Sequence, residues 1–165
     1  MSRSRPRTLS RVAAVQALFQ SEQAAQNPET VIDQFVRHRI GDTPGHGGLD
    51  DGHLTEADVP LFARIVRTAT QQQDTLDAML AAALPETWPL ARIDAVLRAI
   101  MRAGGAELWL ADGPPAKVVI NEYLDVAHGF FDGDEPRMAN GVLDRLAHLL
   151  RPAEFAPAFS SRHGQ

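Results

Sequence analysis

The stretch 116–150 constrains the fold more than any other part of the chain, because its apolar residues predict two successive helices. In the first half, apolar side chains recur at helical spacing and form a wide stripe: Val119, Ile120, Tyr123, Leu124, Val126, Ala127, Phe130 and Phe131. The second half has a narrower seam, formed by Met138, Val142, Leu146 and Leu149. The acidic turn Asp132-Gly133-Asp134 joins the two halves. Because so wide a stripe contacts neighbours on several sides, we expect the first helix to be central.

Helical spacing extends through most of the remaining chain, and no segment shows the alternation typical of a strand. Further helices are expected over about 8–22, 29–40, 55–84 and 88–108, the third being either one helix or two with a break at its glutamines. Gly104-Gly105 predicts tight packing, because each glycine costs a helix roughly 1 kcal/mol. Asp94 is expected to pair with Arg98, four residues later. Together these features predict an all-α protein, with one domain or two small subdomains sharing a core.

The formal net charge of −5 is unevenly distributed. Residues 1–11 contain four arginines and no acidic residue, so the rest of the chain carries −9: the arginines are Arg3, Arg5, Arg7 and Arg11. We expect residues 1–7 to form a disordered arm, with Pro6 disfavouring an early helix and Thr8 or Ser10 capping the first one. Arg7 and Arg11 are four residues apart, so we expect them to share one face at the start of that helix. The arm is either a solvated basic start or a contact for RNA phosphates, and charge alone leaves both interpretations open. A transit peptide is disfavoured, because the apolar face continues into the rest of the chain.

The sequence offers no convincing catalytic or metal site. It contains no phosphate-binding loop, no HExxH, no GxSxG and no cysteine, which excludes disulfides and thiolate metal ligands. Histidines and aspartates do occur in the glycine-rich loop 41–55, but their spacing offers no preorganised ligand geometry. Glu122 could act as a general base, yet pairing with an arginine is the preferred interpretation. His128 is expected to cover an edge of the core. The longest apolar run, residues 79–84, is too short to span a bilayer.

Four segments, in this order and spacing, resemble the NusB family of transcription antitermination factors. They are RVAAVQALFQ at 11–20, RAIMRAGGAEL at 98–108, KVVINEYLDVAHGFF at 117–131 and NGVLDRLAHLLR at 140–151. The resemblance implies a roughly seven-helix bundle of two helical subdomains sharing a core. The expected organisation is a basic arm over 1–7, a helical domain over 8–151 containing the loop 41–55, and a flexible tail over 152–165.

The resemblance also implies a cytoplasmic, non-catalytic protein without a cofactor. NusB proteins bind boxA RNA together with the ribosomal protein NusE, within the RNA polymerase complex that resists termination and supports ribosomal RNA synthesis. The RNA-contacting positions implied for this chain are Arg3, Arg5, Arg7, Arg11, Phe19, Asp134 and Met138. Phe19 replaces a tyrosine common in the family, and Met138 stands where an aromatic residue is frequent. Because the arginines are also sparser than is usual, we expect weaker or differently weighted RNA contacts. By periodicity alone, Phe19 is more consistent with a core position than with a surface that stacks on bases.

The charge distribution is compatible with this partnership. A body of charge −9 repels RNA, so a basic protein docked on the acidic surface would both neutralise it and extend the basic track. Two other interpretations stay open. One is a helical protein–protein adaptor in which the arm is only a solubilising tail. The other is a stand-alone paralogue of the RNA-binding domain that is fused to ribosomal RNA methyltransferases.

Overall fold

A computed structural model describes residues 4–38 and 57–156 of the chain, and it confirms the all-α prediction for this part. The described residues form seven α-helices, two short 3₁₀ turns and no strand. The elements are α1 (Ser4–Ala24), α2 (Pro28–His38), α3 (Val59–Gln71), α4 (Gln73–Ala83), η2 (Leu90–Arg92), α5 (Ala95–Trp109), α6 (Ala116–Phe130), α7 (Glu135–Leu150) and η3 (Pro152–Phe155). The loop 41–55 lies outside the described residues, as do the histidines and aspartates considered there as metal ligands.

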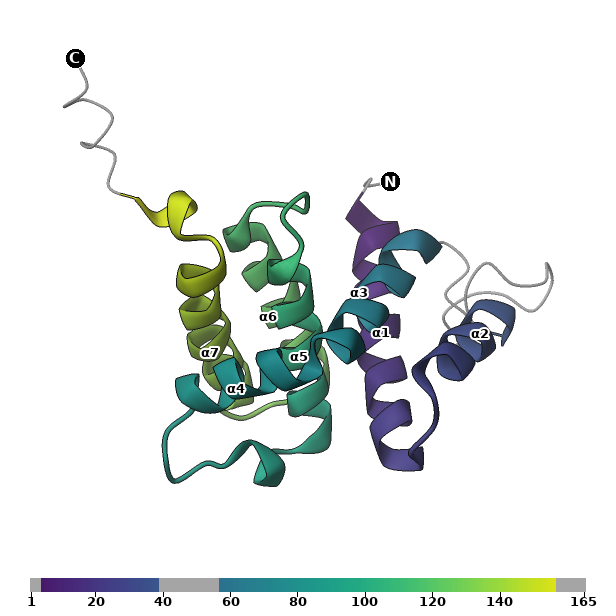
Figure 1. The fold of residues 1–165 in the computed structure, drawn as a ribbon, viewed down its shortest axis with the longest axis horizontal. Coiled ribbons are helices and arrows are strands. Elements are labelled where there is room, and N and C mark those ends of the chain that lie inside the picture. Colours follow the sequence, from purple (N-terminus) through teal and green to yellow (C-terminus); the bar gives the residue numbers. More distant parts are fainter. Residues whose placement is uncertain (1–3, 39–56, 157–165) are drawn as a thin grey trace, which may run out of the picture.

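Helices α1 to α3 form one group and α4 to α7 form the other, as expected for two helical subdomains (Figure 1). The buried apolar side chains of both groups belong to one continuous core. Helix α5 is the most enclosed element, since every residue from Ala99 to Leu108 is buried except Arg102. The helix expected at the centre, α6, buries only one face, and Phe130 at its end is 42% exposed. The central position therefore belongs to α5 more than to α6.

The two glycines in α5 allow α7 to approach closely, which confirms the tight packing predicted from them. A Cβ atom on Gly104 would lie 2.9 Å from both Cδ atoms of Leu143, and one on Gly105 would lie 3.2 Å from Leu146. Both distances are shorter than an ordinary van der Waals contact. The intrinsic cost of glycine in a helix is thus offset by packing against α7.

Two helix boundaries differ from those expected from the sequence. Helix α1 begins at Ser4, so Pro6 lies in its first turn, where backbone N–H groups have no intrahelical partner and proline is tolerated. Helix α5 begins only after Asp94, which caps it by accepting hydrogen bonds from the N–H groups of Val96 and Leu97. The predicted pairing of Asp94 with Arg98 is therefore wrong. The break at the glutamines does occur, since α3 ends at Gln71 and α4 starts at Gln73.

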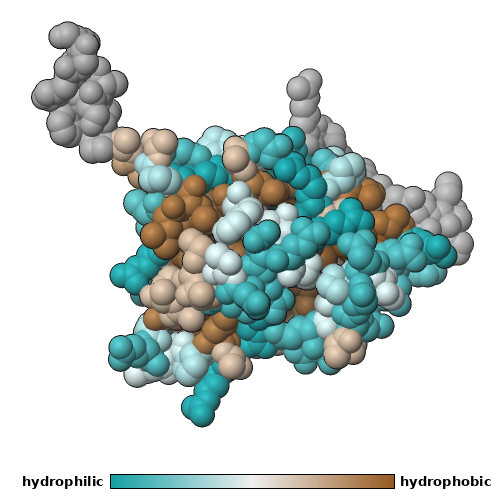
Figure 2. All heavy atoms as spheres, viewed as in Figure 1, coloured by the Kyte–Doolittle hydropathy of each residue, from teal (hydrophilic) through white to brown (hydrophobic). Residues whose placement is uncertain are grey.

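On the face shown in Figure 2, the most hydrophobic surface gathers on the side of α7, while much of the centre is hydrophilic. The large apolar side chains that stay exposed in the described part are Trp88, Val118, Phe130 and Leu149. No helix in the described ranges has both the length and the apolar character required to cross a bilayer.

Candidate nucleic-acid interface

The first turns of α1 are held in place by hydrogen bonds to the start of α3. The Ser10 hydroxyl lies 2.9 Å from the carbonyl oxygen of Pro6 and 2.6 Å from that of Asp58, and the Asp58 N–H donates to Pro6 as well. Ser10 is fully buried, so these bonds are shielded from water. On the other side of the helix, the Thr8 hydroxyl donates to Glu122 of α6 at 2.9 Å. The direction in which α1 projects its N-terminal residues is therefore fixed by two neighbouring helices.

Arg11 lies inside the protein, although the sequence suggested that it shares an exposed face with Arg7. The Arg11 side chain is 2% exposed, and its guanidinium donates two hydrogen bonds, of 2.8 and 2.6 Å, to the carboxylate of Glu107. A third bond, of 2.9 Å, goes to Glu122, and the Tyr123 hydroxyl donates to Glu107 at 2.8 Å. This buried network joins α1, α5 and α6. The pairing of Glu122 with an arginine, predicted from the sequence, is thereby confirmed.

The ionisation of this network follows from its burial. Burial by itself lowers the pKa of Arg11, but the hydrogen bond and the charge of Glu107 outweigh it and raise that pKa above its ordinary value. Burial raises the pKa of the Tyr123 hydroxyl well above its usual range, and the adjacent Glu107 carboxylate raises it further. Arg11 thus stays charged and Tyr123 stays protonated, which is the combination that the hydrogen bonds require.

Arg7, unlike Arg11, is exposed, and it lies beside a polar cavity of about 370 Å³. The cavity is bounded by the first turns of α1 and α3 and by the loop between α5 and α6, whose residues Asp112, Gly113 and Pro114 form one wall. The cavity is also lined by Arg64 of α3, which donates two hydrogen bonds to Asp112, of 2.9 and 3.3 Å. Exposed arginines from two helices therefore border the same cavity.

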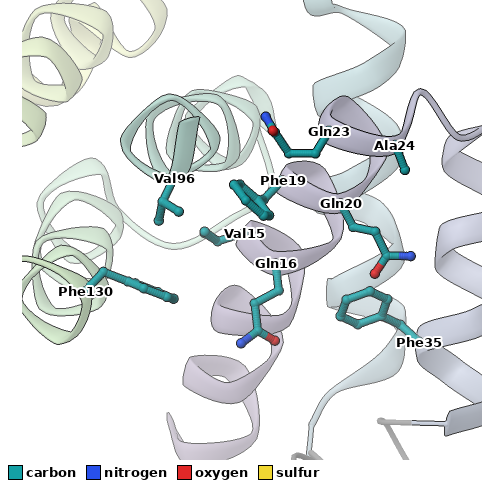
Figure 3. Close-up of a pocket in the computed structure, with 9 residues that line it drawn as sticks. All are labelled: Val15, Gln16, Phe19, Gln20, Gln23, Ala24, Phe35, Val96 and Phe130. Carbon is teal, nitrogen blue, oxygen red and sulfur yellow. The ribbon is translucent and has the colours of Figure 1, made fainter. Parts of the chain in front are cut away.

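Phe19 lies further along α1 and lines an apolar groove of about 480 Å³. Figure 3 shows that the Phe130 ring points from the end of α6 toward α1, while Val96 of α5 lies close to Phe19. Phe19 is partly buried and packs against the core, but one side remains open to the groove. The groove therefore combines three phenylalanine rings, the third being Phe35 of α2, with glutamine amide side chains, a combination that suits stacking and hydrogen bonding of bases.

Asp134 and Met138 lie at the start of α7, as the predicted hairpin requires. Asp134 is exposed and precedes the helix without capping it through its side chain, and Met138 is partly buried against the core. Both line a third cavity, of about 500 Å³, together with Trp88 and Arg137. Leu97 borders this cavity and its neighbour Val96 borders the Phe19 groove, so the two openings lie on either side of the first turn of α5.

The predicted positions thus fall into separate areas and do not form one compact cluster. Arg7 and Phe19 lie on the same helix, about 18 Å apart at 1.5 Å per residue. Asp134 and Met138 lie beyond the first turn of α5, and Arg11 is in the interior. Arg3 lies outside the described residues, and Arg5 falls in the first turn of α1. Arg64 and Phe130 were not singled out as site residues by the sequence, because neither neighbours the arm in sequence.

The general-base interpretation of Glu122 gains no support, because its carboxylate accepts a hydrogen bond from Arg11 at 2.9 Å. His128 is exposed and does not cover the core edge expected for it. Within residues 4–38 and 57–156, no group of histidine, aspartate and glutamate side chains could hold a metal ion.

Several known proteins that are similar to this chain carry the name of one family. The NusB family matches residues 8–148. The transcription antitermination protein NusB of Granulibacter bethesdensis is 64% identical over 154 residues, which cover 93% of this chain and 94% of that protein. The protein of the same name from Gluconobacter oxydans is 56% identical over 144 residues, 87% of each chain. Among solved structures, T. maritima NusB matches with a TM-score of 0.70 and 23% identity, covering 94% of this chain and 99% of that one.

Proposed function

The chain belongs to the NusB family of transcription antitermination factors, and we propose that it acts by binding boxA RNA together with the ribosomal protein NusE. The family is not one of enzymes, and the resemblance recognised in four sequence segments is confirmed. In the proposed role, the complex of both proteins with RNA joins the cytoplasmic transcription machinery and supports synthesis of ribosomal RNA.

The observation that carries the proposal is that the first described turns of α1, which carry Arg7, are fixed by hydrogen bonds to two neighbouring helices. Ser10 and Asp58 fasten the start of α1 on one side, and Thr8 and Glu122 fasten it on the other. Arg7 is exposed on this fixed helix, and Arg3 and Arg5 precede it in the sequence. Because the Arg7 side chain starts from a fixed helix, less conformational entropy is lost when it binds a phosphate.

The groove beside Phe19 supports the proposal from the other end of α1. An RNA strand that contacts Arg7 could follow the helix and place bases against Phe19 and Phe130, since aromatic faces stack on any base. Asp134 and Met138 would contact RNA further on, beyond the first turn of α5. Arg11 takes a different role in this scheme. Its guanidinium is buried between carboxylates, so it would position α1 and leave the phosphate contacts to the residues before it.

The distribution of charge along the chain supports a basic protein as its partner. The chain carries −9 after its first eleven residues, so RNA that extends beyond the arm meets an acidic protein surface. A basic ribosomal protein docked there would replace that repulsion with attraction. RNA affinity should therefore be higher for the complex than for the chain alone.

A gel-shift titration of boxA RNA in the presence of NusE tests the proposal. The wild-type chain should bind boxA more tightly than a scrambled RNA of the same composition. Removing the three arm charges (Arg3→Ala, Arg5→Ala and Arg7→Ala) should weaken binding and flatten the dependence of log affinity on log salt by about two units, at about 0.7 per phosphate contact. A control variant removes the same charge from other exposed positions: Arg37→Ala, Arg67→Ala and Arg92→Ala.

The titration also separates the proposal from the adaptor interpretation. If the arm variant and the control variant bind boxA equally well, the arm is only a solubilising segment. If the chain then still binds NusE, it acts as a protein–protein adaptor. A chain that binds boxA and scrambled RNA alike would contradict the proposed RNA specificity.

A further inference from the structure

Arg64 borders the same cavity as the arm residue Arg7, although 57 positions separate them in the sequence. The fold brings them together because the start of α3 lies against the start of α1, where the Asp58 N–H donates to the carbonyl oxygen of Pro6 at 3.1 Å. Figure 1 shows the N-terminal ends of α1 and α3 side by side. Arg64 lies in the second turn of α3, with half of its side chain exposed.

Arg64 binds the Asp112 carboxylate through a bidentate pair of hydrogen bonds, an arrangement in which an arginine can also bind a phosphate. Two guanidinium nitrogens donate to the two carboxylate oxygens of Asp112, at 2.9 and 3.3 Å. A phosphate group accepts the same bidentate pair of hydrogen bonds. The Asp112 side chain is 69% exposed, and ion pairs between exposed groups contribute little to stability. Exchanging Asp112 for a phosphate should therefore cost the folded protein little.

The other acidic groups at the cavity are already engaged. The Asp58 carboxylate caps α3 by accepting from the Leu61 N–H at 3.0 Å. Glu107 at the back of the cavity is neutralised by Arg11, with 2.6 Å between Arg11 Nη2 and Glu107 Oε2. Asp112 is thus the one cavity carboxylate, among the described residues, whose partner is a surface arginine. If Asp112 turns away, Arg7 and Arg64 give the cavity an excess of positive charge.

We propose that Arg7 and Arg64 form a binding subsite for a phosphate of the RNA backbone, with the Asp112 carboxylate as its competitor in the RNA-free protein. The inference rests on the proposed RNA-binding function and extends it to a residue outside the N-terminal arm. The volume of about 370 Å³ is ample for one phosphate group and part of its ribose. RNA would enter here beside the arm and then follow α1 toward Phe19.

The chain offers a closely matched control for Arg64. Arg67 lies one turn further along α3 and makes the same bidentate pair with Glu29 of α2, at 2.8 and 2.9 Å. The two arginines are 50% and 47% exposed, but Arg67 does not border the Arg7 cavity. Substituting either residue therefore removes one exposed charge and one surface ion pair from the same helix, and only Arg64 is expected to affect RNA.

The experiment measures the affinity of a labelled boxA RNA for the chain in complex with NusE, over a series of salt concentrations, by fluorescence anisotropy. Arg64→Ala should weaken binding about fivefold and flatten the salt dependence by about 0.7 unit, the contribution of one phosphate contact to a single strand. Arg67→Ala should bind like the wild type. Asp112→Asn should strengthen RNA binding, because it removes the carboxylate charge that competes for Arg64 and repels the phosphate. Glu29→Gln should leave RNA binding unchanged.

Equal affinities and salt slopes for Arg64→Ala and Arg67→Ala would overturn the subsite. An Asp112→Asn variant that binds no more tightly than the wild type would refute the competition. Failure of the wild-type complex to bind boxA at all would overturn the proposed function itself, which distinguishes it from a failure of the subsite alone. Thermal unfolding of each variant verifies folding, and all four side chains are exposed, so little change is expected.

Discussion

Replacing Arg11 with alanine distinguishes a structural role for this residue from a direct contact with RNA. The substitution removes three hydrogen bonds to carboxylates: two to Glu107, at 2.8 and 2.6 Å, and one to Glu122, at 2.9 Å. Glu107 would keep only the bond from the Tyr123 hydroxyl, while its charge remains buried without a cation. Removing one partner of a buried ion pair costs about 3–5 kcal/mol. We expect a loss in that range.

Urea unfolding followed by far-UV circular dichroism measures this cost. For a domain of this size, a loss of about 4 kcal/mol lowers the melting temperature by roughly 10 °C. Arg7→Ala is the control, because Arg7 is exposed and surface substitutions usually change stability by no more than about 0.5 kcal/mol. Glu107→Gln should also destabilise the protein, and combining it with Arg11→Ala should cost less than the sum of the two. The reasoning is refuted if Arg11→Ala unfolds at the same urea concentration as Arg7→Ala.

Other expectations concern helix packing, capping and pH. Gly104→Ala should destabilise the protein by about 1–3 kcal/mol, because the new methyl group would collide with Leu143. Gly141→Ala should stabilise it by about 0.5–1 kcal/mol, because no atom lies within 4 Å of the added Cβ atom. Equal urea midpoints for the two variants would contradict this. Asp94→Ala should cost about 1 kcal/mol through loss of the α5 cap, measured by the same unfolding curves. Hydrogen bonds from Arg98 and then Arg102 lower the pKa of Glu22 to about 2. This contribution to stability is full above pH 4.5 and declines as pH falls toward 2, so Glu22→Gln should show a weaker pH dependence over that interval.

Periodicity was a sufficient guide to most of the fold. The hairpin of α6 and α7 lies where its two apolar seams placed it, and Gly104-Gly105 marked a close helix contact. The centre of the fold was assigned less well. A wide apolar stripe predicted α6, but Phe130 and Val118 remain exposed, while α5 is enclosed on nearly all sides by its neighbours. The spacing of apolar residues shows which faces of a helix can be buried. The number of helices packed around it determines how much of each face is buried.

The location of Arg11 could not be predicted from local sequence. Its spacing of four from Arg7 indicated a shared basic face, but its partners Glu107 and Glu122 lie 96 and 111 positions away. One signal was available. Glu107 stands within an otherwise apolar helix segment, and a carboxylate buried there requires a cation. No comparable signal placed Arg64 at the same cavity as Arg7, because that arrangement depends on how α1 and α3 meet.

The most direct test of the proposed function is the affinity for boxA RNA with and without NusE. A labelled boxA oligonucleotide is titrated with the chain at one salt concentration, first alone and then with saturating NusE, and binding is followed by anisotropy. The account predicts weak binding by the acidic chain alone and markedly tighter binding by the complex, with scrambled RNA bound less well. Equal affinity for boxA in the two titrations would contradict it.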